Sequence, residues 1–142
     1  MNQIKMIMIV IGLACFMTAG VASAATVELD DDSGKNAFTM VDCNLLANDV
    51  DIMLTDGVVG GIDCDEDNNA IGLSTCHTAG LTSERSEDVD GTTETVSGAS
   101  FPSASTLQGT VSSSFPEQSC DVTNAVGAAT AKKDKDLAEE GS

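Results

Sequence analysis

The sequence predicts a mostly β protein: a small disulfide-stabilised antiparallel β-sandwich or irregular sheet with a loose C-terminal tail. Short runs rich in Val, Ile and Thr alternate with Gly, Asp and Asn turns, which is typical of antiparallel strands. Four cysteines follow residue 24, an even number that suits a disulfide framework. After residue 24 the aromatic residues are only Phe38, Phe101 and Phe115, so the predicted core is thin and needs crosslinks.

Residues 1–24 have the features of a cleavable secretory signal peptide. Lys5 is the only charge before the apolar run 6–17, which is too short to span a bilayer. Ala22 and Ala24 place small side chains at the positions that signal peptidase requires, so we expect cleavage after Ala24.

The alternative for this segment is a lipoprotein signal acylated at Cys15. A lipobox has Leu three residues before the cysteine, where this chain has Gly12. No later apolar run approaches the roughly 18 to 20 residues of a membrane span. The sequence therefore predicts a secreted or periplasmic protein with no membrane span after signal cleavage.

The charge balance restricts the partners. The formal net charge is −17, and loss of Lys5 with the signal makes it −18. Nucleic acids and anionic membrane surfaces both attract basic patches, so the composition argues against either as a partner. An acidic surface suits a soluble protein, a cation binder or a protein of a saline habitat.

Residues 25–122 form the predicted single β-rich domain. The acidic segment 25–36 reads as an extended strand or a linker, and 37–41 has β-type composition. The alternating run 50–55 is followed by Asp56-Gly57, which suits a two-residue type I′ turn, and then by a return strand from Val58. A bulge at Gly60-Gly61 would bring Ile62 opposite Val50 and complete this hairpin.

The second half of the chain gives weaker signals. Residues 70–76 read as a strand, and the charged segment 81–90 as an edge strand or an exposed loop. Residues 92–119 are rich in small and hydroxylated residues, with two Ser-Phe-Pro triplets that could mark two similar strand ends. Residues 123–142 read as a short helix or a disordered tail, because no apolar stripe is available to dock a helix.

The four cysteines most simply form two disulfides in an exported chain. Of the three possible connectivities we favour Cys43–Cys64 with Cys76–Cys120, because the first pair flanks the predicted hairpin. A zinc site is the alternative use of four thiols, but no two of them have the usual CxxC spacing.

A loop that could bind Ca²⁺ is the most suggestive local motif. Asp63, Asp65, Asp67 and Asn69 occupy positions 1, 3, 5 and 7 of a stretch that resembles the first half of an EF-hand or dockerin calcium loop. The stretch departs from that pattern at position 12, where Ser74 replaces the bidentate Glu. The alternative reading is a solvated acidic turn.

Catalytic signals are weak. His77 is the single histidine, no G-x-S-x-G elbow is present, and Cys76-His77 lacks the first cysteine of a C-x-x-C-H haem motif. The sequence therefore predicts a non-enzymatic structural or interaction protein, such as a surface, matrix or filament subunit. Its partner would be itself or another extracellular protein. The alternative is a soluble acidic Ca²⁺-binding protein, and Ca²⁺ is the only cofactor that the sequence suggests.

Overall fold

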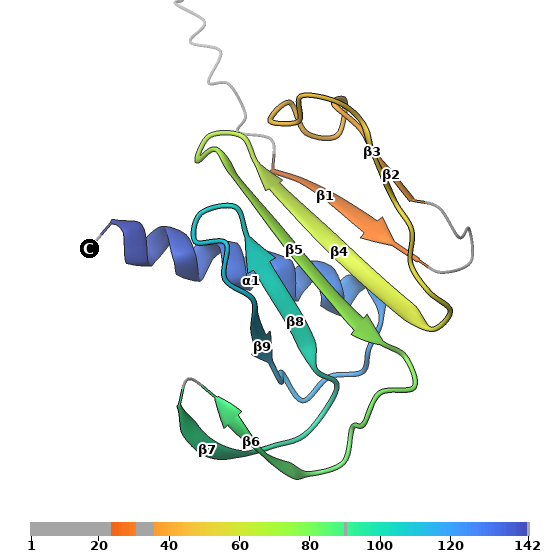
Figure 1. The fold of residues 1–142 in the computed structure, drawn as a ribbon, viewed down its shortest axis with the longest axis vertical. Helices are drawn as coiled ribbons and strands as arrows, with labels where there is room; N and C mark the ends of the chain where they lie inside the picture. Colours follow the sequence, from red (N-terminus) through yellow and green to blue (C-terminus); the bar gives the residue numbers. More distant parts are fainter. Residues whose placement is uncertain (1–23, 31–35, 90, 142) are drawn as a thin grey trace, which may run out of the picture.

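The computed structural model describes residues 24–30, 36–89 and 91–141 (Figure 1). The predicted signal peptide lies outside these residues apart from Ala24. None of the helices in the described ranges is long and apolar enough to cross a membrane. A five-stranded antiparallel sheet in the order β1-β4-β5-β8-β9 forms the centre of the fold. Its strands are β1 (Ala24–Leu29), β4 (Val58–Asp65), β5 (Ala70–His77), β8 (Phe101–Ser105) and β9 (Ser112–Ser114).

Two small antiparallel pairs accompany this sheet. The first joins β2 (Asn36–Phe38) to β3 (Val50–Ile52), and the second joins β6 (Arg85–Val89) to β7 (Thr92–Val96). The mostly β, disulfide-stabilised class that the sequence predicts is therefore confirmed. The predicted strand 70–76 is β5, and segment 81–90 contains the hairpin strand β6.

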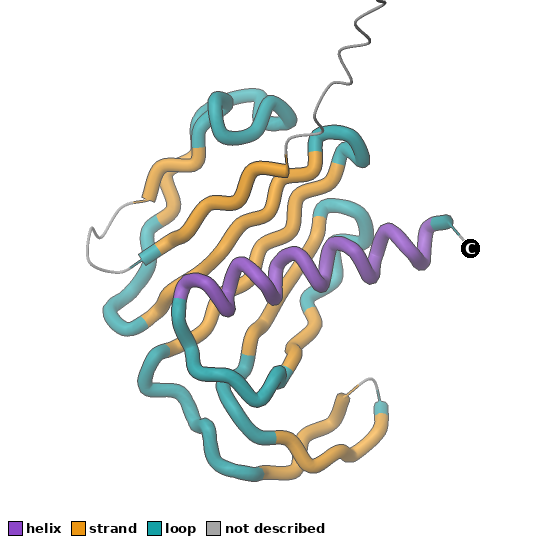
Figure 2. The backbone as a smooth tube through the Cα atoms, turned by 180° about the vertical axis from the view of Figure 1, so that it is seen from behind, coloured by secondary structure: helices purple, strands orange, loops and turns teal. Residues whose placement is uncertain are grey.

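The C-terminal segment is the helix α1 (Val122–Glu140), which crosses one face of the sheet (Figure 2). Asp121 caps the helix: its side chain accepts a hydrogen bond from the Asn124 amide at 2.9 Å. Of the two alternatives that the sequence left open, the structure has the helix, and it packs on the sheet. The face toward the strands consists of small and charged residues rather than of an apolar stripe: Ala125, Ala129, Lys132, Lys133 and Asp136.

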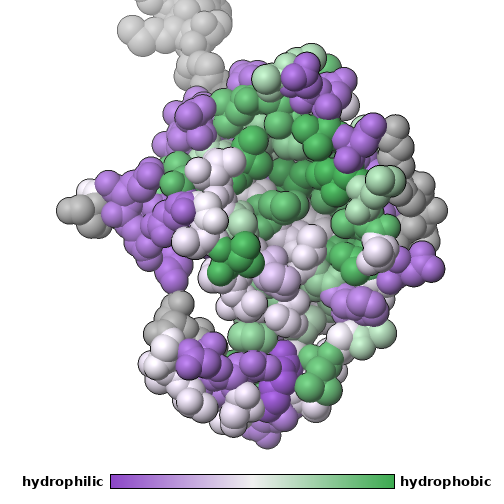
Figure 3. Space-filling model, viewed as in Figure 1, coloured by the Kyte–Doolittle hydropathy of each residue, from purple (hydrophilic) through white to green (hydrophobic). Residues whose placement is uncertain are grey.

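The opposite face of the sheet is covered on one half by residues 36–54. Leu29, Phe38 and Ile62 pack there with Cys43 and Cys64, which form a disulfide. Figure 3 shows apolar residues gathered in this region, whereas the β6–β7 hairpin is polar. The disulfide thus ties an irregular segment to the central strand β4.

The predicted hairpin 50–62 is wrong in its pairing. Val58 donates its amide to the Thr55 carbonyl, and Gly57 has φ +77°, so a turn does form at Asp56-Gly57. Asp56 is not among the residues with positive φ, so the turn is not of the predicted type I′. The strand before it, β3, nevertheless pairs with β2 instead of β4. Ile62 lies opposite Val27 on one side and Leu73 on the other, because β4 is a central strand with two neighbours.

A second core lies between the sheet and the start of α1. Phe101, Val59 and Ala125 are buried there beside the disulfide Cys76–Cys120. Both disulfides have the connectivity that the sequence favours, and each lies in one of the two cores. Because each core is small, the crosslinks supply stability that aromatic residues usually provide.

Candidate functional site

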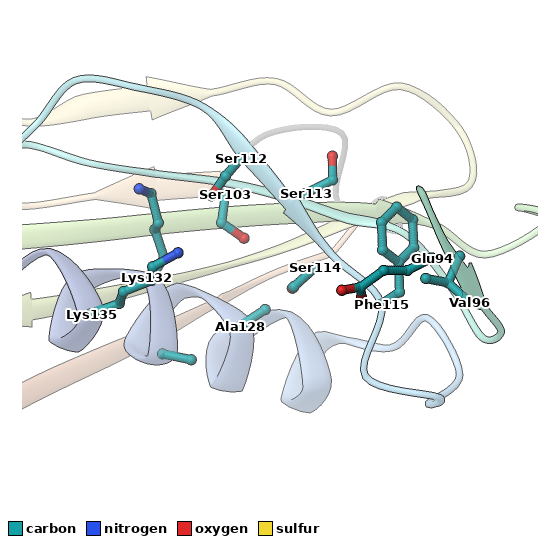
Figure 4. Close-up of a pocket in the computed structure, with 11 residues that line it drawn as sticks. Glu94, Val96, Ser103, Ser112, Ser113, Ser114, Phe115, Ala128, Lys132 and Lys135 are labelled. Carbon is teal, nitrogen blue, oxygen red and sulfur yellow. The ribbon is translucent and has the colours of Figure 1, made fainter. Parts of the chain in front are cut away.

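A groove of about 330 Å³ runs beside strand β9, between helix α1 and strand β7 (Figure 4). We call it the edge groove. Residues 112–115 form one wall, and Glu94 and Val96 of β7 close one end. The helix contributes two alanines and the side chains of Lys132 and Lys135. In Figure 4 the two lysines lie toward the Ser112 end and Glu94 lies toward the Phe115 end. The groove therefore combines serine hydroxyls with apolar contacts from Val96, Phe115 and the two alanines, and has the two lysines at one end.

The groove lies between α1 and the sheet, on the side of the sheet that ends with β9. Ser112, Ser113 and Ser114 all line it, although successive side chains of a strand point to opposite faces. The lining also includes Ser103 of β8, so the groove begins between α1 and the sheet and reaches the strand edge at β9. Strand β9 has β8 as its single neighbour, so its outer edge has no partner strand among the described residues.

Backbone hydrogen bonding determines which groups of β9 face the groove. The Thr106 amide donates to the Ile71 carbonyl at 3.0 Å, which shows that even-numbered residues of β8 bond toward β5. The odd-numbered residues of β8 then bond toward β9, where their partners are Ser112 and Ser114. The N–H and C=O of Ser113 consequently point away from β8. They are available to an added strand.

The β6–β7 hairpin is held in place beside the groove by Arg85. The Arg85 guanidinium donates to the carbonyls of Leu81, Ser83 and Gly98 at 3.1 to 3.2 Å. It also lies over the ring of Phe115, 5.1 Å from the ring centroid. Because these contacts fix the hairpin against the end of β9, the far wall of the groove has a defined position.

Lys132 is held between the groove and the sheet. Its ammonium donates to Asp136 Oδ1 at 2.8 Å, and the Ser105 hydroxyl donates to Asp136 Oδ2. Burial alone would raise the pKa of Asp136, but the hydrogen bonds from Lys132 and Ser105 outweigh it and lower the pKa. Lys132 and Asp136 thus form a buried pair that anchors the helix to β8.

Lys133 forms a second charged cluster between α1 and the end of β4. Its ammonium lies 3.3 Å from Asp63 Oδ2, 3.0 Å from Asp65 Oδ2 and 3.0 Å from Asp134 Oδ1. Burial opposes the charged form of Lys133, but these carboxylates raise the pKa above its usual value. Asp63 is 2% exposed, and its Oδ1 has no hydrogen-bond partner among the described residues. Lys133 is therefore the cation that the buried Asp63 depends on.

The residues predicted to bind Ca²⁺ are divided between two environments. Asp63 and Asp65 point toward α1 and contact Lys133, whereas Asp67 and Asn69 are exposed in the β4–β5 turn. The Asp65 carboxylate accepts hydrogen bonds from the amide and the side chain of Asn68, at 3.1 and 2.9 Å, and closes this turn. The described residues contain no group of three or more His, Cys, Asp or Glu side chains placed to hold a metal ion. Calcium binding stays a prediction.

Acid should destabilise the protein by protonating Asp65, because the Asp65 carboxylate closes the β4–β5 turn with Asn68 and contacts Lys133 of α1. The Asn68 side chain, with a further contribution from Lys133 against the cost of burial, lowers the pKa of Asp65 from 3.8 to about 2. A carboxyl group whose pKa is lower in the folded state stabilises the fold above pH 4 and loses this contribution as the pH falls toward 2. We expect Asp65→Asn to lose less stability than the parent between pH 5 and pH 2, measured by urea denaturation. Asp67→Asn, which removes the same charge from the exposed turn, is the control. An equal acid response in the parent and Asp65→Asn would contradict the expectation.

His77 takes part in a turn. Its Nδ1 accepts a hydrogen bond from the Ala79 amide at 3.0 Å, and the Gly80 amide donates to its carbonyl at 2.8 Å. The neighbouring Cys76 is bonded to Cys120, so its thiol is not available for a haem thioether. All four cysteines after residue 24 are in disulfides, which also removes the thiolates of the zinc alternative.

Sequence analysis did not identify the residues that α1 contributes to the two charged clusters. The buried helix residues have helical spacing, but they include Lys132, Lys133 and Asp136, which are usually found on a solvated face. The i,i+4 pair Lys132–Asp136 was the available signal. The edge groove had no local signal, because its walls come from segments far apart in the chain. A scan against protein-family models and searches of curated proteins and of solved structures found no match for this chain.

Proposed function

We propose that this chain is a non-enzymatic structural or interaction protein, secreted or periplasmic, that serves as a subunit of a surface, matrix or filament assembly. In this proposal it binds a partner by strand addition along the edge groove. Two observations support it: Ser113 lines a groove bounded by α1 and β7, and the register of β9 directs the Ser113 N–H and C=O away from β8. An extended segment in this groove would satisfy these backbone groups and add a strand to the sheet.

The composition of the edge supports the same proposal. Sheet edges that proteins protect from association usually carry charged residues, Pro or bulges, and β9 consists of three serines. Its main protection is its shortness, because short edge strands present few backbone groups. The groove walls compensate by offering side-chain contacts on both sides of an added strand.

Proline at position 113 should abolish this association. Ser113→Pro removes the outward N–H without removing a hydrogen bond of the β8–β9 ladder, since that N–H points away from β8. We expect the parent protein to form oligomers as its concentration rises. We expect the apparent dissociation constant of Ser113→Pro to be higher by about 10-fold or more, because the variant lacks an interfacial hydrogen bond and meets the partner strand sterically. Sedimentation velocity and negative-stain microscopy would measure this.

The matched control is Ser113→Ala, which keeps the backbone donor and changes only the side chain. Circular dichroism melting curves should show that both variants remain folded. A parent protein that stays monomeric at all protein and salt concentrations would contradict the proposal. So would association that is equally strong in Ser113→Pro and Ser113→Ala.

A further inference from the structure

Strand β1 is the other outer strand of the sheet, with β4 as its single partner strand among the described residues, and its backbone can be oriented in the same way as that of β9. The Thr78 amide donates to the Gly57 carbonyl at 2.7 Å, so odd-numbered residues of β4 bond toward β5 and even-numbered residues toward β1. The β1 partners of these even-numbered residues are Ala25, Val27 and Leu29. The N–H and C=O groups of Thr26 and Glu28 therefore point outward.

The side chains of Thr26 and Glu28 lie on the helix face of the sheet. They stand opposite Asp63 and Gly61, and both of these residues of β4 face α1. Glu28 is exposed there. Edge β1 thus presents a carboxylate on the same face on which Lys132 and Lys135 line the edge groove of β9.

The two edges also run in the same direction. All four neighbouring strand pairs of the central sheet are antiparallel, so β1, β5 and β9 are parallel to one another. A second copy in the same orientation, placed edge to edge, brings its β1 parallel to β9 with both helices on one side. This arrangement continues the sheet and keeps the two inner faces aligned.

We propose that the occupant of the edge groove is strand β1 of a second copy of this chain, with Glu28 of that copy beside Lys135. The proposal rests on the strand-addition function proposed above and specifies its partner. Glu28 pairs beside Ser112, at the end of the groove that Lys135 lines, and away from Glu94 at the other end. In this register the Ser113 N–H donates to the Glu28 carbonyl of the second copy. The Ser113 C=O then faces the Asp30 N–H, which exchanges its 3.2 Å bond to the Asn36 side chain for this new acceptor.

This contact is head-to-tail, because one edge of each copy meets the other edge of the next. A heterologous contact of this kind produces an open chain of subunits unless the rotation between copies closes a ring. The twist between neighbouring strands, about −20 to −25°, accumulates across the five strands of each copy and makes such a chain helical. The net charge of −17 opposes the approach of copies in general, so the Glu28–Lys135 contact contributes mainly to orientation.

Charge exchange tests the pairing of the two side chains. Glu28→Lys and Lys135→Glu should each weaken self-association by about 10-fold or more, because each places like charges in contact. The double variant Glu28→Lys/Lys135→Glu should restore association to near the parent level. Sedimentation velocity at equal ionic strength would measure all four proteins. Failure of the double variant to recover any association would contradict the pairing of Glu28 with Lys135.

A mixing experiment tests the head-to-tail geometry. Thr26→Pro blocks the β1 edge without removing a bond to β4, and Ser113→Pro blocks the β9 edge. Each variant alone should be monomeric, whereas an equimolar mixture should form a 1:1 dimer, because the intact β1 of one fits the intact groove of the other. Thr26→Ala and Ser113→Ala are the folded controls, and both should keep assembling.

The outcomes separate this inference from the function on which it rests. If Ser113→Pro abolishes assembly and Thr26→Pro does not, the groove binds a strand other than β1, so the inference fails and the proposed function stands. A mixture that remains monomeric also overturns the inference. A parent protein that forms only a closed dimer through β9 overturns it as well. If the parent protein never associates, both proposals fail.

Discussion

A valine in place of Gly61 is expected to destabilise the protein by about 3 kcal/mol or more, because the backbone of α1 occupies the space that a side chain would need. A Cβ atom at Gly61 would lie 2.3 Å from the backbone nitrogen of Val126 and 2.5 Å from its Cα. These are backbone atoms of a packed helix, so no flexible side chain can move aside. The helix itself would have to shift, and the buried contacts of Ala125 and Ala129 would be lost with it.

Chemical denaturation of Gly61→Val would measure this loss, and Gly127→Ala is its control. Gly127 lies in α1 with nothing within 4 Å of a Cβ atom, so alanine there should stabilise the protein by about 0.5 to 1 kcal/mol through helix propensity. Similar stabilities for Gly61→Val and the parent would show that α1 does not approach β4 this closely. The helix also forms one wall of the edge groove, so Gly61→Val should weaken self-association too.

Replacing Lys133 with methionine should cost about 3 to 5 kcal/mol, the usual effect of removing one partner from a buried ion pair. Methionine has nearly the same length, so the main change is the loss of the ammonium. Asp63 is then left buried with neither of its carboxylate oxygens paired, since Lys133 is the cation that contacts it. An uncompensated carboxylate in this position is the source of the expected loss.

Two further variants identify the cause of that loss. Glu140→Gln removes a charge from an exposed position of the same helix, and its effect should stay within about 0.5 kcal/mol. The double variant Lys133→Met/Asp63→Leu removes both buried charges and should recover most of the stability, because apolar pairs can replace buried ion pairs. The result that contradicts this account is a double variant less stable than Lys133→Met alone, measured by urea denaturation.

The sequence was sufficient where local chemistry decides the structure. The disulfides followed from cysteine parity and spacing, and strand β5 followed from a short apolar run bounded by turn residues. The hairpin prediction failed at β3; it placed a turn at Asp56-Gly57 correctly but gave that turn the wrong type. Strand β3 pairs with β2, and the Cys43–Cys64 disulfide holds this segment against β4. Neither β2 nor Cys64 lies within residues 50–62, so the pattern of that segment could not predict the pairing.

The candidate site could be predicted only in part, for a different physical reason. Asp63 and Asp65 stood out as a carboxylate pair, but their counter-ion comes from Lys133, far along the chain. Charged residues that are buried by pairing look the same in sequence as charged residues on a surface. The open edges of β1 and β9 follow from the strand order, which is a property of the whole sheet.

The helix α1 follows all nine strands of the described part of the chain. During synthesis the strands therefore appear first, and the helix that covers Asp63 and walls the groove appears last. Until then the β9 edge lacks its lysines, and the Cys76–Cys120 bond cannot bring the helix start to β5. A chain whose C-terminal helix has not yet folded therefore lacks one wall of the proposed docking surface. Under the proposed function, assembly would wait until each subunit has matured.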